Sequence, residues 1–134
     1  MLFSDNDGMT IRSEFQPAVD EFISDLEDFA TGSYLKPEEK EFWDQPFDPA
    51  VLPELKRLLE KLLDDLDLLP DDPSAETLAA VVRNRVDELA EFNARHHDAV
   101  IEPEEKDILA GIIHDAAAAT GAEDAALAEL PELD

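Results

Sequence analysis

The sequence predicts an all-α fold, a compact bundle of four long helices with one or two short helices. Apolar residues recur at steps of three and four in four long segments, and proline or glycine separates these segments. No stretch of useful length alternates apolar and polar residues as a half-buried strand does. A chain of 134 residues has the length of one domain. We therefore expect a single helical domain over 1–134, with 1–12 and 131–134 loosely ordered.

The first long helix is predicted over about 14–31. Its apolar positions share one face at about 100° per residue, and acidic residues occupy the opposite face. These apolar positions are Phe15, Val19, Phe22, Ile23, Leu26 and Phe29. Ser13 and Gln16 have the spacing of a capping box, and Gly32 is suited to end the helix in a left-handed conformation.

The connector, residues 33–53, is rich in proline and aromatic residues. Pro37 followed by Glu38 and Glu39 is a typical helix start, because proline fits the first helical position and acids face the positive end of the helix dipole. We expect a short helix over about 37–43. Further prolines prevent one continuous helix through the connector, namely Pro46, Pro49 and Pro53.

The second and third long helices are predicted over about 53–69 and 74–98. The second carries a stripe of leucines at alternating steps of three and four, and flanking leucines make it wider than a coiled-coil seam. The stripe consists of Leu52, Leu55, Leu59, Leu62, Leu66 and Leu69. Pro70 and Pro73 end this helix, and Ser74 is a favourable N-cap for the next one.

The fourth long helix is predicted over about 103–120, and a last short helix over about 123–130. One side of the long helix is apolar and carries Ile108, Leu109, Ile112, Ile113 and Ala116. Its start resembles an earlier segment, since residues 101–108 (IEPEEKDI) match residues 35–42 (LKPEEKEF). A duplicated helix pair would explain this similarity, but the similarity stops downstream. We favour two independent helix starts built on the same capping chemistry.

The chain is strongly acidic throughout. It has 35 Asp and Glu against 10 Lys and Arg, a formal net charge of -25. Residues 1–67 hold 18 acids and 6 bases, and residues 68–134 hold 17 acids and 4 bases, so the charge belongs to the whole surface and not to a tail. Nucleic-acid phosphates and anionic membrane surfaces would be repelled. We therefore expect no direct nucleic-acid contact and no membrane association.

Composition gives few indications of where the protein acts. The absence of cysteine excludes disulfides, thiol catalysis and thiolate metal sites. No apolar run approaches the roughly 18–20 residues of a membrane span. The first residues, MLFSDNDG, lack the basic start and the apolar stretch of a signal peptide. We expect a cytoplasmic protein without a cofactor.

Aromatic residues gather in the connector: Tyr34, Phe42, Trp43 and Phe47. Large aromatics in a loop either fill a gap in the core or anchor a partner. Adjacent Phe42 and Trp43 cannot both point inward from a short helix. We therefore name Phe42, Trp43 and Phe47 as candidate partner-binding residues, with a core role as the alternative.

Arg85 is a further candidate for partner binding. It projects onto the apolar face of the third long helix, beside Leu78, Val82 and Leu89. A guanidinium in apolar surroundings must be paired, because an isolated buried charge costs several kcal/mol. It forms either a structural ion pair at the edge of the core or a pocket for an anionic group of a partner.

The three histidines lie beside carboxylates and are weak candidates for a metal site. His96 and His97 are followed by Asp98, and His114 by Asp115. Imidazole nitrogen and carboxylate oxygen together bind borderline cations such as zinc. The helical spacing points these side chains in different directions, so no convergent set of ligands is predicted.

The function predicted from the sequence is a non-enzymatic, acidic helical module that binds a basic protein partner. No catalytic triad order, phosphate-binding glycine loop or metalloprotease motif is present. One alternative is a metal-binding or metal-dependent helical protein that uses histidine and carboxylate ligands. Another is a nucleic-acid mimic that inhibits a DNA-binding protein. A homodimer formed through the leucine stripe of 52–69 is also possible.

Overall fold

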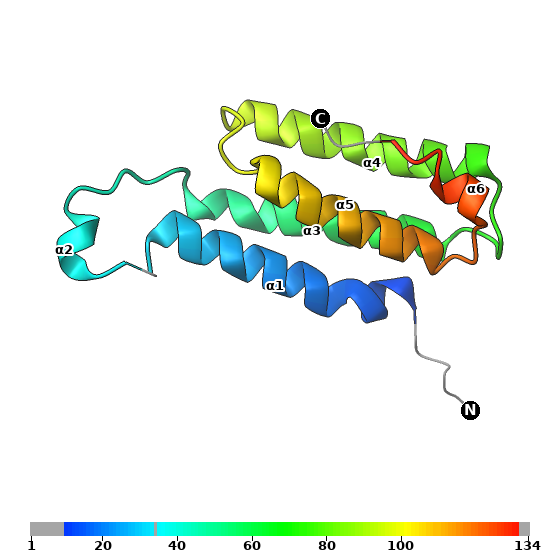
Figure 1. The fold of residues 1–134 in the computed structure, drawn as a ribbon, viewed down its shortest axis with the longest axis horizontal. Helices are drawn as coiled ribbons and strands as arrows, with labels where there is room; N and C mark the ends of the chain where they lie inside the picture. Colours follow the sequence, from blue (N-terminus) through cyan, green and yellow to red (C-terminus); the bar gives the residue numbers. More distant parts are fainter. Residues whose placement is uncertain (1–9, 34, 132–134) are drawn as a thin grey trace.

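Four long helices run up and down along one axis, with the chain reversing direction at each connection (Figure 1). The computed structural model describes residues 10–33 and 35–131. In chain order the elements are α1 (Ile11–Thr31), α2 (Pro37–Lys40), the 3-10 turn η1 (Pro49–Val51), α3 (Leu52–Asp67), α4 (Ala75–Arg95), α5 (Pro103–Ala118) and α6 (Asp124–Leu127). The described residues contain no strand. The predicted all-α bundle, with four long helices and one or two short ones, is therefore confirmed.

Helix α3 is the centre of the bundle. It packs against α1 on one side and α4 on the other, while α5 contacts α1 and α3, and α6 contacts α4 and α5. Its fully buried leucines are Leu52, Leu55, Leu59, Leu62, Leu63 and Leu66. Five of the six predicted stripe positions are thus covered within one chain, and Leu69 is partly buried against the same core. The stripe is thus used mainly within the chain.

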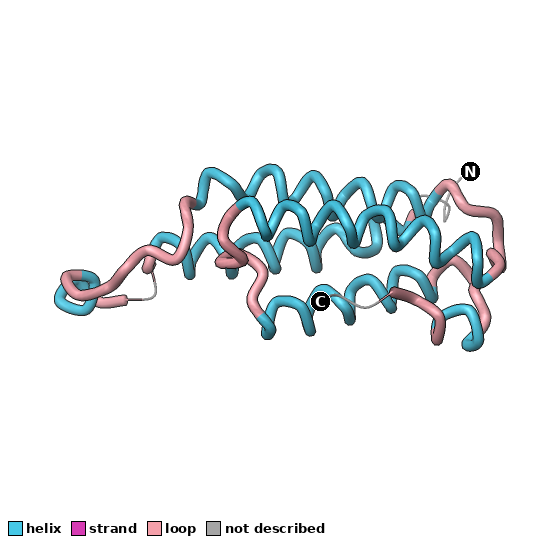
Figure 2. The backbone as a smooth tube through the Cα atoms, turned by 90° about the horizontal axis from the view of Figure 1, so that it is seen from above, coloured by secondary structure: helices cyan, strands magenta, loops and turns pink. Residues whose placement is uncertain are grey.

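The segment around α2 lies beyond the end of the bundle. Both views place it outside the layer of long helices (Figures 1 and 2). The connector meets the bundle again through Phe47, which is buried in the core, and through η1, which packs on α1 and α3. The connector thus contains two short pieces of helix: the predicted helix over 37–43 ends at Lys40, and the turn η1 was not predicted.

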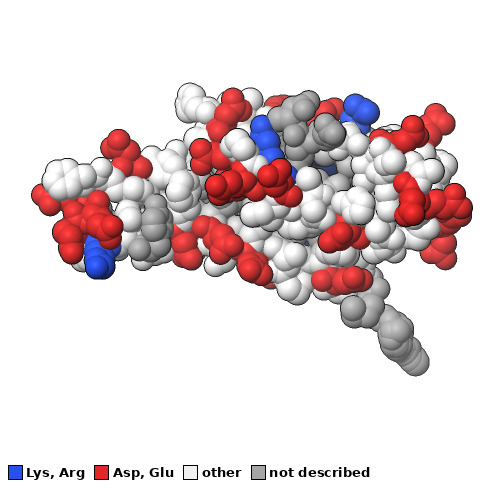
Figure 3. Space-filling model, viewed as in Figure 1, with Lys and Arg blue, Asp and Glu red and all other residues white. Residues whose placement is uncertain are grey.

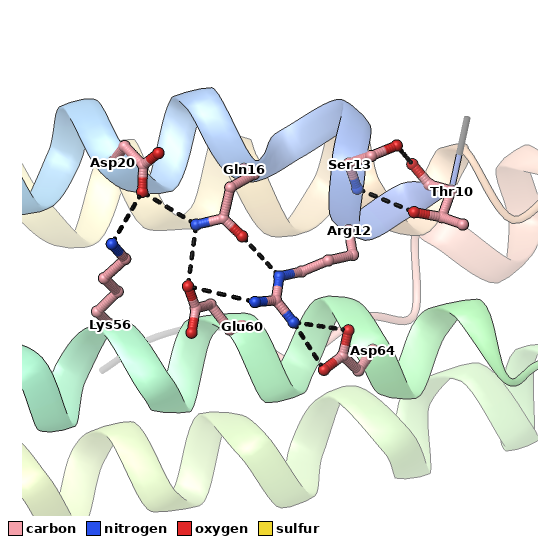
Figure 4. Close-up of polar contacts among 8 residues, drawn as sticks. All are labelled: Thr10, Arg12, Ser13, Gln16, Asp20, Lys56, Glu60 and Asp64. Carbon is pink, nitrogen blue, oxygen red and sulfur yellow. Dashed lines mark hydrogen bonds and ion pairs between the residues drawn. The ribbon is translucent and has the colours of Figure 1, made fainter. Parts of the chain in front are cut away.

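Acidic side chains lie along the length of the face shown in Figure 3, and a polar network neutralises some of them between α1 and α3 (Figure 4). Arg12 Nη1 donates to both oxygens of Asp64, at 3.0 and 2.9 Å, and Arg12 Nη2 lies 3.4 Å from Glu60. Gln16 accepts from Arg12 Nε at 2.6 Å and donates to Glu60 and Asp20, each at 3.0 Å. The hydrogen bond from Gln16 is the main reason why the pKa of Asp20 is lowered.

Every ion pair between helices in the described part of the chain has one partner on α3. Besides the Arg12 pairs, these are Lys56–Asp20 at 3.3 Å, Arg85–Asp65 at 2.5 Å and Arg95–Glu54 at 2.6 Å. The hydrogen bond from Arg95 lowers the pKa of the Glu54 carboxyl. Four of the ten basic residues of the chain thus form ion pairs where acidic helices meet.

Helix α1 begins earlier than predicted, and the predicted cap was wrong. The N-cap is Thr10, whose hydroxyl accepts from the Ser13 backbone N–H at 3.0 Å. The Asp67 carboxylate at the end of α3 accepts from the N–H groups of Ile11 (2.7 Å) and Arg12 (3.0 Å). The first amides of a helix have no partner within it, so this distant carboxylate allows α1 to start at Ile11.

Residues 10–12, expected to be loosely ordered, thus belong to the cap and first turn of α1. The other residues expected to be loose lie outside the described part, except 131.

A buried asparagine sets the turn between α4 and α5. Asn93 is 4% exposed, and its Nδ2 donates to the Ile101 carbonyl while its Oδ1 accepts from the Ile101 N–H, both at 2.8 Å. The predicted helix to residue 98 ends at Arg95 instead. The reason is that His97 and Asp98 both have positive φ, at 62° and 56°, a conformation incompatible with a continuing right-handed helix.

Helix α1 ends at Thr31 as predicted, but four other helices end slightly before the predicted residue. Helices α3 and α5 end two residues early, at Asp67 and Ala118, and α2 and α6 have only four residues each.

The two similar segments, 35–42 and 101–108, begin helices in the same way. In each, the N-cap N–H donates to the glutamate three residues on: Lys36 to Glu39 at 2.9 Å and Glu102 to Glu105 at 3.1 Å. None of the described helices combines the length and the apolar character needed to cross a membrane.

We predict that Asn93→Ala destabilises the protein by about 2–4 kcal/mol. The substitution leaves the buried N–H and carbonyl of Ile101 without partners, and each unsatisfied buried group costs about 1–3 kcal/mol. Urea denaturation followed by circular dichroism measures this loss. Asn84→Ala, at an exposed position of the same helix, is the control, and its free energy of unfolding should change by less than about 0.5 kcal/mol. Equal effects at the two positions would contradict the role of Asn93.

Candidate functional site: the groove between α1 and α5

A groove of about 740 Å³ runs between α1 and α5. The two helices are antiparallel, so the second half of α1 faces the start of α5 (Figure 1). The α1 side consists of Ala18, Glu21, Phe22, Asp25, Leu26 and Phe29, and the α5 side of Glu102, Pro103, Glu104, Glu105, Ile108 and Ile112.

The floor of the groove is apolar and belongs to the core. Phe22 and Leu26 are buried on it, while Phe29 is 37% exposed and Ile108 is 50% exposed at its sides. The groove exists because the apolar side of α5 is wider than the bundle covers. Leu109 and Ile113 turn inward to the core, and Ile108 stays open on the groove side.

The rim of the groove is acidic. Its carboxylates are those of Glu21, Asp25, Glu102, Glu104 and Glu105, and no basic residue is among the residues that line it. Figure 3 shows red acidic side chains over α1 and over the start of α5, with uncharged surface between them. The ion pairs described above neutralise other acids, so this rim keeps its negative charge.

Glu105 is the rim residue most affected by its surroundings. Partial burial raises its pKa, because removal of water disfavours the charged carboxylate, and the neighbouring Glu102 and Glu104 act in the same direction. A hydrogen bond accepted from the Glu102 N–H opposes this effect. A cation placed in the groove would therefore stabilise the charged form of the Glu105 carboxylate.

The residues that line the groove supply apolar surface and carboxylates. Apolar surface favours the removal of a hydrocarbon group from water, at roughly 25 cal/mol per Å² buried. The carboxylates attract cations, more strongly where water is partly excluded. The arrangement is therefore suited to a ligand that carries both apolar and cationic groups.

The structure separates the aromatic residues named from the sequence. Phe42 is 87% exposed, Trp43 is half-buried with its ring against Gly32, and Phe47 is 8% exposed in the core. Tyr34 lies outside the described residues. Phe47 therefore has the core role given as the alternative, and Phe42 is the member of the set that is open to a partner.

Arg85 is engaged in ion pairs within the bundle. Its Nε lies 2.5 Å from Asp65 of α3, and its Nη1 lies 2.6 Å from Glu88 on its own helix. These hydrogen bonds raise its pKa further above the usual arginine value. The geometry corresponds to the structural ion pair at the edge of the core, one of the two roles considered for this residue.

The three histidine side chains do not point toward one common site. His96 packs edge-to-face on Phe92 with ring centroids 4.8 Å apart, and His114 lies 3.5 Å from Asp115 on the exposed side of α5. His97 and Asp98 occupy the turn after α4. Within residues 10–33 and 35–131, no group of three or more histidine and acidic side chains is placed to hold a metal ion.

Sequence reasoning missed the groove, although one signal was present. Ile108 directly precedes Leu109, and adjacent side chains on a helix point about 100° apart, so one of the two lies nearer the edge of the apolar face. That pattern indicates an apolar side chain outside the core, but it does not reveal which helix lies beside it. No protein-family model, curated protein or solved structure matches this chain.

We predict that Arg85→Ala destabilises the protein by about 1–2 kcal/mol, because it leaves Asp65 and Glu88 unpaired in a partly buried site. Thermal unfolding at low and high salt measures the effect, which should shrink as salt screens the remaining carboxylates. Arg83→Ala, at an exposed position of α4, removes the same charge and should change stability by less than about 0.5 kcal/mol. Equal losses would show that only net charge matters.

We predict that Glu105→Gln stabilises the protein at neutral pH and that the gain disappears in acid. A raised native pKa means that the folded protein binds the proton more readily, so stability from this group falls as pH rises through that pKa. Denaturation at about pH 8 and at about pH 3.5, below the ordinary pKa of a glutamate in the unfolded chain, tests the sign. Glu104→Gln, with the same charge change at an exposed neighbour, is the control. A Glu105→Gln gain that is equal at both pH values would contradict the prediction.

Proposed function

We propose that this protein is a non-enzymatic interaction module that binds a basic segment of a protein partner in the groove between α1 and α5. The observation that carries the proposal is the combination of an apolar floor with a rim of five carboxylates and no basic residue. The net charge of -25 would speed the approach of a basic partner through long-range attraction. Buried apolar contacts in the groove would then hold it.

We favour the groove over the other candidate contacts because a ligand there can bury apolar side chains. Charge pairs at an exposed surface contribute only about 0–1 kcal/mol each, whereas full burial of one large apolar side chain contributes about 1.5–3 kcal/mol. A surface with charge alone would therefore bind many basic proteins weakly. Phe42 offers a second exposed apolar contact, on the segment around α2.

A nucleic-acid mimic would need a different kind of surface. A mimic reproduces phosphate charge, so its affinity depends on the number and spacing of carboxylates and not on an apolar floor. The metal-binding alternative requires a convergent set of ligands, and the described residues do not supply one. The groove favours a protein segment with apolar and basic residues.

The test compares two variants with the same loss of charge. The rim variant carries Glu21→Gln, Asp25→Asn and Glu104→Gln. The control carries Glu27→Gln, Asp87→Asn and Glu129→Gln at exposed positions outside the groove. The probe is a fluorescent peptide rich in lysine and leucine, and its affinity is measured by anisotropy at about 50 and about 500 mM salt.

We expect the rim variant to lose about tenfold in affinity, since three charge pairs together contribute about 1–2 kcal/mol. The control should lose clearly less, and salt should weaken binding to the unmodified protein. Equal losses in the two variants would show attraction by total charge alone, the behaviour of a mimic. Binding that is insensitive to both variants and to salt would contradict the proposed function.

A further inference from the structure

The groove is about as long as three turns of an α-helix. Its α1 wall extends from Ala18 to Phe29, eleven positions later. At about 1.5 Å per residue this wall is about 16 Å long, or three helical turns. The opposite wall is the antiparallel start of α5, from 102 to 112 (Figure 1). Both walls are helices, so the groove follows the direction of α1 and α5.

The apolar side chains along both walls recur with helical spacing. On α1, Phe22 and Leu26 are four residues apart, and on α5 Ile108 and Ile112 are four residues apart. Such rows form ridges between which the ridges of another helix can pack. An extended strand is a poor fit, because it would need a free backbone edge for pairing. The backbone of each wall is already hydrogen-bonded within its own helix.

The carboxylates that line the groove indicate which kind of helix would bind there. Glu21 and Asp25 are one turn apart along the α1 edge, and three glutamates lie at the start of α5 on the other side. A helix in the groove would meet carboxylates on both flanks of its apolar stripe. A second copy of this chain, with a net charge of -25, does not supply the basic flanks that this requires.

We propose that the occupant is a cationic amphipathic α-helix of about three turns, contributed by a partner protein. This inference rests on the proposed function and narrows it. The apolar stripe of the helix packs on Ile108 and Ile112, which are exposed or half-buried on the α5 wall, above the buried floor of Phe22 and Leu26. Its lysine and arginine side chains lie on both sides of that stripe, toward Glu21 and Asp25 and toward the start of α5.

The experiment uses two synthetic peptides of about 16 residues with the same lysine and leucine composition. In the first, leucines recur at steps of three and four, so that they form one stripe on a helix. In the second, the same residues are permuted so that leucines are spread around the helix. Affinity is measured by fluorescence anisotropy, and helix formation in the peptide by circular dichroism. The first peptide should bind at least about tenfold more tightly and gain helix on binding.

Two protein variants locate the site. Ile108→Asp places a carboxylate on the apolar side of the groove. Leu68→Asp makes the same change at a residue that is 83% exposed and outside the groove. Ile108→Asp should weaken binding of the first peptide at least about tenfold, and Leu68→Asp should leave it nearly unchanged. Circular dichroism of each variant checks that the bundle remains folded.

The outcomes separate this inference from the function on which it rests. Equal affinity for the two peptides, or an Ile108→Asp variant that binds like the unmodified protein, would overturn the helical occupant. The proposed function would survive that result if the rim variant still bound more weakly than its control. If neither the rim variant nor Ile108→Asp changed the affinity, both proposals would fail.

Discussion

Four basic side chains join α3 to its neighbours, and the arrangement of the bundle depends on them. Arg12 and Lys56 act between α1 and α3, and Arg85 and Arg95 between α4 and α3. Each pair contributes little by itself, because most of these groups are exposed to water, so the buried leucines of α3 supply most of the stability. The cations have another effect. They prevent carboxylates from facing one another, unneutralised, where the acidic helices pack together.

Helix α5 lacks this kind of attachment. In the described part of the chain no ion pair joins it to another helix, and it is held by buried residues such as Leu109 and Ile113. The acids at its start and those on the facing edge of α1 have no cation between them, and a groove lies there. Because no basic residue lines the groove, its rim is negatively charged, and the proposed ligand is for that reason a cationic one.

The helices could be predicted because their signals are local. Apolar spacing, proline and helix-start acids placed all four long helices, with ends within a few residues. The pairing of Arg85 also followed from its position on an apolar face. The caps supplied by Asn93 and Asp67 could not be predicted, because their partners are set by tertiary packing. The groove was missed for the same reason, since it requires knowing that α1 and α5 are neighbours.

The capping of α1 by Asp67 links the order of folding to the architecture. The carboxylate lies 56 residues from the Ile11 amide that it binds. A helix end that depends on so distant a group gains its last hydrogen bonds only after the two helices have docked, and non-local contacts of this kind form late. The start of α1 should therefore open together with the end of α3 as one cooperative unit, and hydrogen exchange at the amides of Ile11 and Arg12 should report the separation of the helices.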